Sequence, residues 1–185
     1  MKQNESIVMY VLRLAGTLLL ICAVTAGLLA GVNAITAPII AELNAAATQE
    51  AISAVLPGGF DSEITDYADA SGIVSKVYQG EAGYALEVGP GGFDNTITMM
   101  VGVDNEGKVL GISIVNHTET AGLGAVADAD TPKGIAFREQ FIGTSGSVSV
   151  TKDGGTLDAI TGATITSRAI CAGVNAALDC VAGLG

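Results

Sequence analysis

The 185 residues carry a formal net charge of −11, and their number fits one domain of ordinary size plus a membrane anchor. Nineteen acidic residues outnumber eight Lys and Arg. The chain therefore lacks the clustered cations that neutralise phosphates, and this excludes nucleic acid as a partner. Three cysteines without a Cys-x-x-Cys pair exclude a disulfide or metal framework, and we interpret Cys171 and Cys180 as small buried apolar residues on opposite faces of one helix.

Residues 14–35 contain no charged side chain. A helix of this run is about 33 Å long, which is enough to cross the hydrocarbon core of a bilayer. We interpret the run as a transmembrane helix. Signal cleavage after Ala34 stays an alternative, whereas Ile21 before Cys22 disfavours a lipoprotein signal, which needs a small residue there.

Lys2 and Arg13 precede the apolar run. Cationic residues stay on the cytoplasmic side, so residues 1–13 are expected to be a short cytoplasmic segment. The prediction is a single-pass protein of the cell (inner) membrane, with its main domain on the extracytoplasmic face.

Residues 36–59 are predicted to form a linker helix that ends at the Pro-Gly-Gly of positions 57–59. Apolar residues recur at helical spacing there, at Ile40, Leu43, Ala47, Ala51 and Val55. These residues form one apolar face of the predicted helix. The face is expected to pack on the domain that follows at residues 60–185, on a membrane partner, or on both.

Four runs rich in β-branched residues follow, at 73–78, 84–88, 96–103 and 109–115. Short turns containing glycine separate most of them, so antiparallel hairpins are expected. The Gly-Pro-Gly-Gly at 89–92 is interpreted as a plain turn, with an anion-binding nest as the alternative.

A polar loop at residues 116–124 follows the last of these strands and holds the only histidine, His117. A lone histidine near one carboxylate is more often structural than catalytic. Residues 132–141 are then predicted to form a short helix with Pro near its first turn. Its Lys133 and Arg138 are interpreted as solvated, with contact to a ligand or partner as the alternative.

Residues 147–151 and 157–160 read as strands, and residues 164–181 repeat apolar residues at helical spacing. The turn between the last two elements is rich in hydroxyls. Thr161 or Thr164 is expected to cap the helix, and the helix terminus also suits a phosphate.

This turn resembles a known motif. Asp158, Thr161, Gly162, Ala163 and Thr164 match the flavinylation motif of the FMN-binding domain family, which includes the G subunit of Rnf complexes and the C subunit of Nqr complexes. The resemblance implies that Thr164 carries FMN covalently through its phosphate, with the rest of the motif and the nearby Ser167 around it. No His, Lys or Cys stands in the motif to activate the hydroxyl, in agreement with attachment by a separate flavin transferase.

The loop at residues 117–124 resembles the second signature of that family, with Ala121 in place of a proline. By resemblance, the loop lies beside the flavin ring and contributes His117, Glu119, Thr120, Gly122, Leu123 and Gly124 to the site.

The resemblance implies an α+β fold, in which a transmembrane helix precedes a mixed, largely antiparallel sheet with flanking helices. It implies an electron-carrier subunit of a membrane-bound, ion-translocating ferredoxin:NAD oxidoreductase (Rnf complex), with no independent substrate-turnover site. The implied partners are the other Rnf subunits, the flavin transferase and the lipid bilayer. Two alternatives stay open: the C subunit of a Na-translocating NADH:quinone oxidoreductase (Nqr), and a membrane-anchored binding or assembly module without a redox cofactor.

Overall fold

The computed structural model describes the backbone of residues 2–184 and divides into two compact units between Ala46 and Ala47. Helix α1, Lys2–Val55, is continuous and contains Pro38. Its apolar side chains from Met9 to Leu43 are exposed, and the part from Met9 onward is long and apolar enough to cross a membrane. The side chain of Lys2, on which the predicted orientation partly rests, lies outside the described residues.

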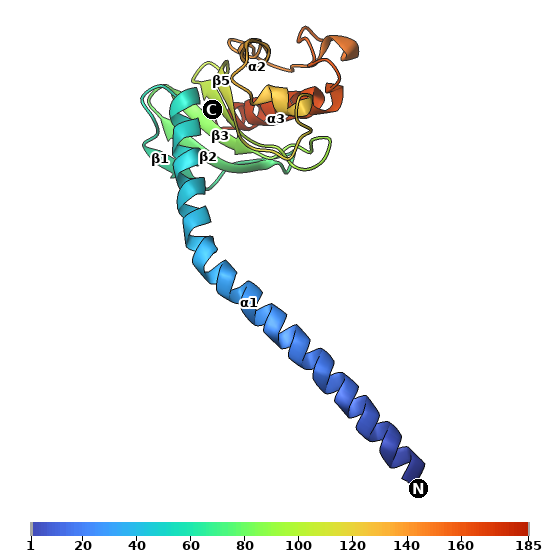
Figure 1. Ribbon diagram of the computed structural model, residues 1–185. Coiled ribbons are helices and arrows are strands. Elements are labelled where there is room, and N and C mark those ends of the chain that lie inside the picture. Colours follow the sequence, from blue (N-terminus) through green and yellow to red (C-terminus); the bar gives the residue numbers. More distant parts are fainter. Residues whose placement is uncertain (1, 185) are drawn as a thin grey trace. The chain divides into compact units, whose positions relative to one another are not determined.

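The second unit is built on a five-stranded antiparallel sheet in which the strands follow chain order (Figure 1). The strands are β1 Ser62–Ile64, β2 Val74–Gly80, β3 Gly83–Val88, β4 Thr98–Asp104 and β5 Val109–Asn116. The four predicted strands and the α+β class are confirmed. The short edge strand β1 was not predicted, because its sequence Ser-Glu-Ile shows no apolar run.

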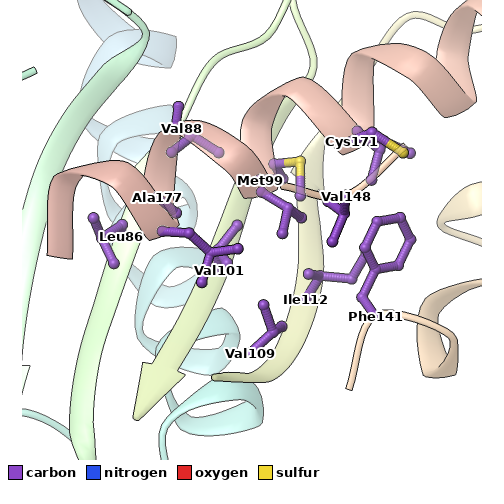
Figure 2. Close-up of a cluster of buried hydrophobic side chains, with 14 of the residues drawn as sticks. Leu86, Val88, Met99, Val101, Val109, Ile112, Phe141, Val148, Cys171 and Ala177 are labelled. Carbon is purple, nitrogen blue, oxygen red and sulfur yellow. The ribbon is translucent and has the colours of Figure 1, made fainter. Parts of the chain in front are cut away.

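Alternation of side chains along the strands gives the sheet two buried faces. On one face, Leu86 and Val101 pack with helix α3, Thr164–Ala182 (Figure 2). On the other face, neighbouring residues such as Ala85 and Met100 pack with the last turns of α1. The domain therefore has three layers, and Ala51, Ile52, Val55 and Leu56 belong to its core.

The close packing of α1 on the sheet depends on a glycine. A Cβ at Gly102 of β4 would collide with the backbone carbonyl of Val55. The residue paired with it on β5, Gly111, has ordinary van der Waals space, with Val55 Cα at 3.8 Å. Only the first of these two glycines is required by the approach of the helix.

Helix α3 confirms the helix predicted at residues 164–181 and lies in the core. It is long and apolar enough to cross a membrane, but most of it is buried inside the domain. Cys171 and Cys180 are both buried in this helix, as interpreted from the sequence. Burial raises the pKa of the Cys171 thiol to about 11.

The predicted short helix is confirmed as α2, Pro132–Glu139, with Thr131 as its N-cap. The interpretation of Arg138 as solvated was wrong. Its guanidinium donates to the carbonyls of Ala127 and Ala129, at 2.8 and 3.2 Å, and pairs with Asp130. Arg138 therefore fastens α2 to the preceding segment, which contains the 3₁₀ helix η1, Gly124–Ala127.

The strands predicted at residues 147–151 and 157–160 do not form. The amide of Asn175 occupies both polar groups of Val148, accepting from its N–H at 2.7 Å and donating to its carbonyl at 2.9 Å. A single bridge joins Val150 to Leu157. The chain then turns through the 3₁₀ helix η2, Thr151–Asp153.

Candidate functional site

The site is built around the turn that leads into α3. The N–H of Ala163 donates to the carbonyl of Ile160 at 2.9 Å, and Gly162 adopts a φ of 81°, which a residue with a side chain rarely adopts. The N-cap of α3 is Ala163, which provides no side-chain hydrogen bond. The prediction that Thr161 or Thr164 caps the helix was therefore wrong, and both hydroxyls are left for other contacts.

Ser167 holds this turn in shape. Its hydroxyl is fully buried, accepts from the N–H of Ile160 at 3.0 Å and donates to the carbonyl of Ala163 at 3.0 Å. One side chain thus links the start of the turn to its end. Ser167 therefore stabilises the turn from inside the domain, where solvent does not reach it.

Asp158 is held by its backbone. The side-chain amide of Gln140 accepts from the Asp158 N–H at 2.7 Å and donates to its carbonyl at 3.3 Å, so it pairs with the chain as a neighbouring strand does. Asp158 and the exposed Thr161 line a cavity beside the turn. Gln140 carries no sequence signal for this role, since it is the C-cap of α2 and lies 18 residues away.

Thr164 is half-buried, and its hydroxyl has a cationic neighbour. The ammonium Nζ of Lys152 donates to Thr164 Oγ1 at 3.1 Å. The motif itself contains no lysine, as the sequence showed. Lys152 comes from η2, outside the motif, and only the folded chain brings it there.

The segment that carries Lys152 is fixed to α3. Asp153 accepts two hydrogen bonds from the guanidinium of Arg168, one of them 2.6 Å long. This pairing lowers the pKa of the Asp153 carboxyl below its usual value. Because Arg168 stands one turn after Thr164 on α3, the pair holds η2 against the first turns of the helix.

Glu119 connects the second motif to the first. Its carboxylate is 8% exposed and accepts from Thr166 Oγ1 at 2.6 Å and from the backbone N–H of Phe93 at 2.7 Å. A Cβ at Gly92 or Gly124 would collide with this carboxylate. Glu119 therefore joins three segments: the glycine-rich segment after β3, the loop after β5 and the first turn of α3.

The glycine-rich residues 89–92 were interpreted as a plain turn, but the chain bends at residues 93–95 instead, and Gly91 forms an antiparallel bridge with Thr96. The N–H groups of Gly89 and Gly92 donate to the carbonyls of Ile73 and Asn95, at 2.8 and 2.7 Å. Those amides are therefore used within the chain. The backbone N–H of the next residue, Phe93, donates to the Glu119 carboxylate, and the side chain of Phe93 is exposed.

The loop at residues 117–124 closes on itself and touches the Thr164 turn. The carbonyl of Thr120 accepts from the N–H groups of Leu123 and Ala125, at 3.1 and 3.2 Å. The side chain of Leu123 lies over Gly162, where a Cβ would be 3.0 Å from it. Gly122 needs its φ of 77°, whereas Gly124 makes room for Glu119.

Two cavities flank the turn. One of about 290 Å³ opens at Thr164, and its lining combines both motifs with Phe93 and Lys152. The second, of about 590 Å³, is lined by Gly122, Asp158, Thr161 and the face of α2 that carries Lys133. Large apolar side chains stand exposed at the rim of the first cavity: Phe93, Leu123 and Ile165.

His117 lies apart from these cavities. Its Nδ1 accepts from the N–H of Glu119 at 3.2 Å, and its Nε2 is 3.7 Å from Asp128. His117 does not line either of these two cavities. Its observed contacts shape the loop.

Comparisons with known proteins match this architecture. Residues 92–179, which include both motifs, match the FMN-binding domain family, and residues 1–55, a range that contains α1, match the RnfG N-terminal region. A flavin-binding domain joined to this type of N-terminal helix defines the class of protein.

The G subunit of an ion-translocating oxidoreductase complex from Methanosarcina acetivorans is 31% identical over 176 residues, which are 89% of this chain and 91% of that protein. The G subunit of the Na(+)-translocating ferredoxin:NAD(+) oxidoreductase complex from Acetobacterium woodii is 33% identical over 68% of this chain and 69% of its own length. A corresponding G subunit from Pseudomonas aeruginosa is 39% identical over 92 residues, 48% of this chain and 43% of that protein. The chain belongs to the RnfG family, the G subunits of ion-translocating oxidoreductase complexes.

Proposed function

We propose that this chain carries electrons within an Rnf-type complex by means of FMN bound as a phosphate ester of Thr164. Membership in the RnfG family makes it a membrane protein and an electron-transport subunit of an oxidoreductase complex, with other subunits of that complex as partners. The covalent bond to Thr164 and its formation by a flavin transferase are our proposal.

The observation that carries the proposal is the position of the Thr164 hydroxyl. It lies at the mouth of a cavity lined by both motifs, at the first residue of α3. The N-terminus of a helix favours the remaining negative charge of a phosphodiester. The exposed apolar side chains of Phe93, Leu123 and Ile165 suit a flat, largely apolar ring.

Bound FMN supplies the ability to take up and release electrons. The residues of the chain hold and orient it. An ester at Thr164 prevents dissociation, the rigid turn fixed by Ser167 sets the direction in which the cofactor leaves the helix, and the exposed rim leaves it open to partners. The net acidic domain disfavours additional negative charge, so it lowers the potential at which the flavin is reduced.

For the orientation, we propose a cytoplasmic N-terminus and an extracytoplasmic domain after residue 46. Arg13 before the apolar run supports this direction. Protease added to sealed right-side-out vesicles should digest the domain, and protease added to inverted vesicles should leave it intact. The reverse pattern would overturn the orientation without affecting the cofactor site.

The covalent cofactor is tested by intact mass. After co-expression with a flavin transferase, the chain should gain the mass of one FMN minus one water. Thr164→Ala should abolish the gain and leave a folded domain, because the hydroxyl is half-buried and makes one described hydrogen bond, to Lys152. Thr156→Ala, an exposed threonine outside both motifs, is the matched control and should be modified normally. A wild-type chain without added mass, or a modified Thr164→Ala chain, contradicts the proposal.

A further inference from the structure

The cations of the domain are few, and most have an acidic partner. Six Lys and Arg follow residue 46. Lys108, Arg138 and Arg168 form ion pairs with Glu106, Asp130 and Asp153, and the neighbouring Tyr78 and Glu87 raise the pKa of Lys76. The other two cations, Lys133 and Lys152, form no ion pair among the described residues. They line the two cavities that flank the Thr164 turn.

Of these two lysines, Lys152 contacts the Thr164 hydroxyl. Contacts of the next residue, Asp153, hold the backbone of this segment in place. The N–H of Asp153 donates to the carbonyl of Val150 at 2.9 Å, and the Asp153 carboxylate is clamped by Arg168 of α3. The segment that places the Lys152 ammonium beside Thr164 is thus η2, which the Asp153–Arg168 ion pair fixes to α3, the helix that begins with Thr164.

We propose that Lys152 is the positioning residue for the flavin at Thr164. Before attachment its ammonium orients the hydroxyl, and after attachment it is the counter-ion of the phosphodiester. This inference rests on the proposed function, since it requires a phosphate ester at Thr164.

Physical chemistry supports both parts of this role. Lys152 donates to Oγ1, so the hydroxyl must direct its own proton elsewhere, which fixes the orientation of the nucleophile. The phosphodiester adds one negative charge to a strongly acidic domain. A neighbouring ammonium stabilises that charge together with the N-terminus of α3.

The first measurement is the rate of flavin attachment to the full-length chain in detergent. Purified flavin transferase is added with FAD as the donor of the FMN phosphoryl group, and the modified fraction is followed by intact mass. In this transfer Thr164 Oγ1 bonds to the FMN phosphorus and gives up its proton, while the phosphoanhydride bond of FAD breaks and AMP leaves. Lys152→Gln should lower the initial rate by about fivefold, the upper end for an exposed charged pair. Lys152→Arg should restore most of the rate, because it keeps the charge. Lys108→Gln removes the same charge away from both cavities and should react like the wild type.

The second measurement is the thermal unfolding midpoint of modified and unmodified protein, for the wild type and each variant. Flavin attachment should raise the midpoint less in Lys152→Gln than in the wild type or in Lys108→Gln. The difference should disappear in about 1 M salt, where charges are screened beyond about 3 Å. A purely structural lysine would instead change the midpoint of the unmodified chain.

The outcomes separate the two proposals. Equal rates and equal midpoint gains for Lys152→Gln and the wild type overturn the role of Lys152. So does a slow Lys152→Gln variant whose unmodified form already melts early, or a loss that Arg does not restore. A wild-type chain that takes up no flavin overturns the proposed function instead.

Discussion

At the scale of single residues, Glu119 organises the site. A carboxylate that is 8% exposed is costly to bury unless its oxygens are hydrogen-bonded, and both oxygens of Glu119 are. Its partners lie 26 and 47 residues away along the chain. The glutamate therefore sets the relation between Phe93 and the first turn of α3, which together border the cavity at Thr164.

Replacing Glu119 tests this role. Glu119→Ala leaves the Phe93 N–H and the Thr166 hydroxyl without their partner and should lower the free energy of unfolding by about 2–4 kcal/mol. Glu119→Gln should cost less, because its carbonyl still accepts from Phe93 and the Thr166 hydroxyl can rotate to accept from its amide. Denaturant unfolding of the detergent-solubilised chain measures both. An Ala variant as stable as the Gln variant would contradict the role.

At the scale of elements, the loop after β5 offers a simple change. Ala121 is exposed, and its N–H makes no backbone hydrogen bond among the described residues. Ala121→Pro should therefore stabilise the chain by about 0.4–1 kcal/mol, because proline restricts the unfolded state. Ala125→Pro is the matched control and should destabilise, since the Ala125 N–H donates to Thr120. Unfolding midpoints of the two variants should move in opposite directions.

The contact between α1 and the sheet gives a second test at this scale. Gly102→Ala forces a methyl group onto the Val55 carbonyl and should cost about 1–3 kcal/mol. Gly111→Ala, at the paired position on β5, meets only ordinary contacts and should be close to neutral. Similar losses in both variants, measured by urea unfolding, would show that α1 does not approach the sheet as closely as described.

The elements with long apolar patterns were predictable from the sequence, and those held by side chains were not. The four longer strands and α3 follow from periodicity alone. Residues 147–151 have strand-like composition, yet Asn175 takes the hydrogen-bonding groups of Val148. Likewise, the motifs identified Thr164 and the 117–124 loop, but nothing in the sequence indicates that Lys152 lies beside Thr164 or that Gln140 holds Asp158.

At the scale of the whole molecule, α1 has two different roles along its length. From Met9 to Leu43 its side chains are exposed and mostly apolar, whereas Ala51, Ile52 and Val55 are buried in the domain. The division between the two units falls at residue 46. The first part of the helix is thus a candidate membrane span, and its last turns are a layer of the domain.

Two truncations distinguish these roles. A chain starting at residue 47 should leave the membrane fraction and remain monomeric, because the buried end of α1 is kept. A chain starting at residue 57 loses that layer, exposes Tyr78, Ala85 and Met100, and should aggregate. Flotation and size-exclusion chromatography measure both outcomes. A soluble, monomeric shorter chain would contradict the assignment of that layer to the core.

Helix α3 closes the core and also begins with Thr164. During synthesis, one face of the sheet has no cover until residues 164–182 have left the ribosome. The proposed acceptor hydroxyl takes its place only when that helix docks and brings Ser167 and Arg168 to their partners. Under the proposed function, a flavin transferase that recognises this arrangement would modify folded domains and not incomplete chains, so flavin attachment would report that the domain has folded.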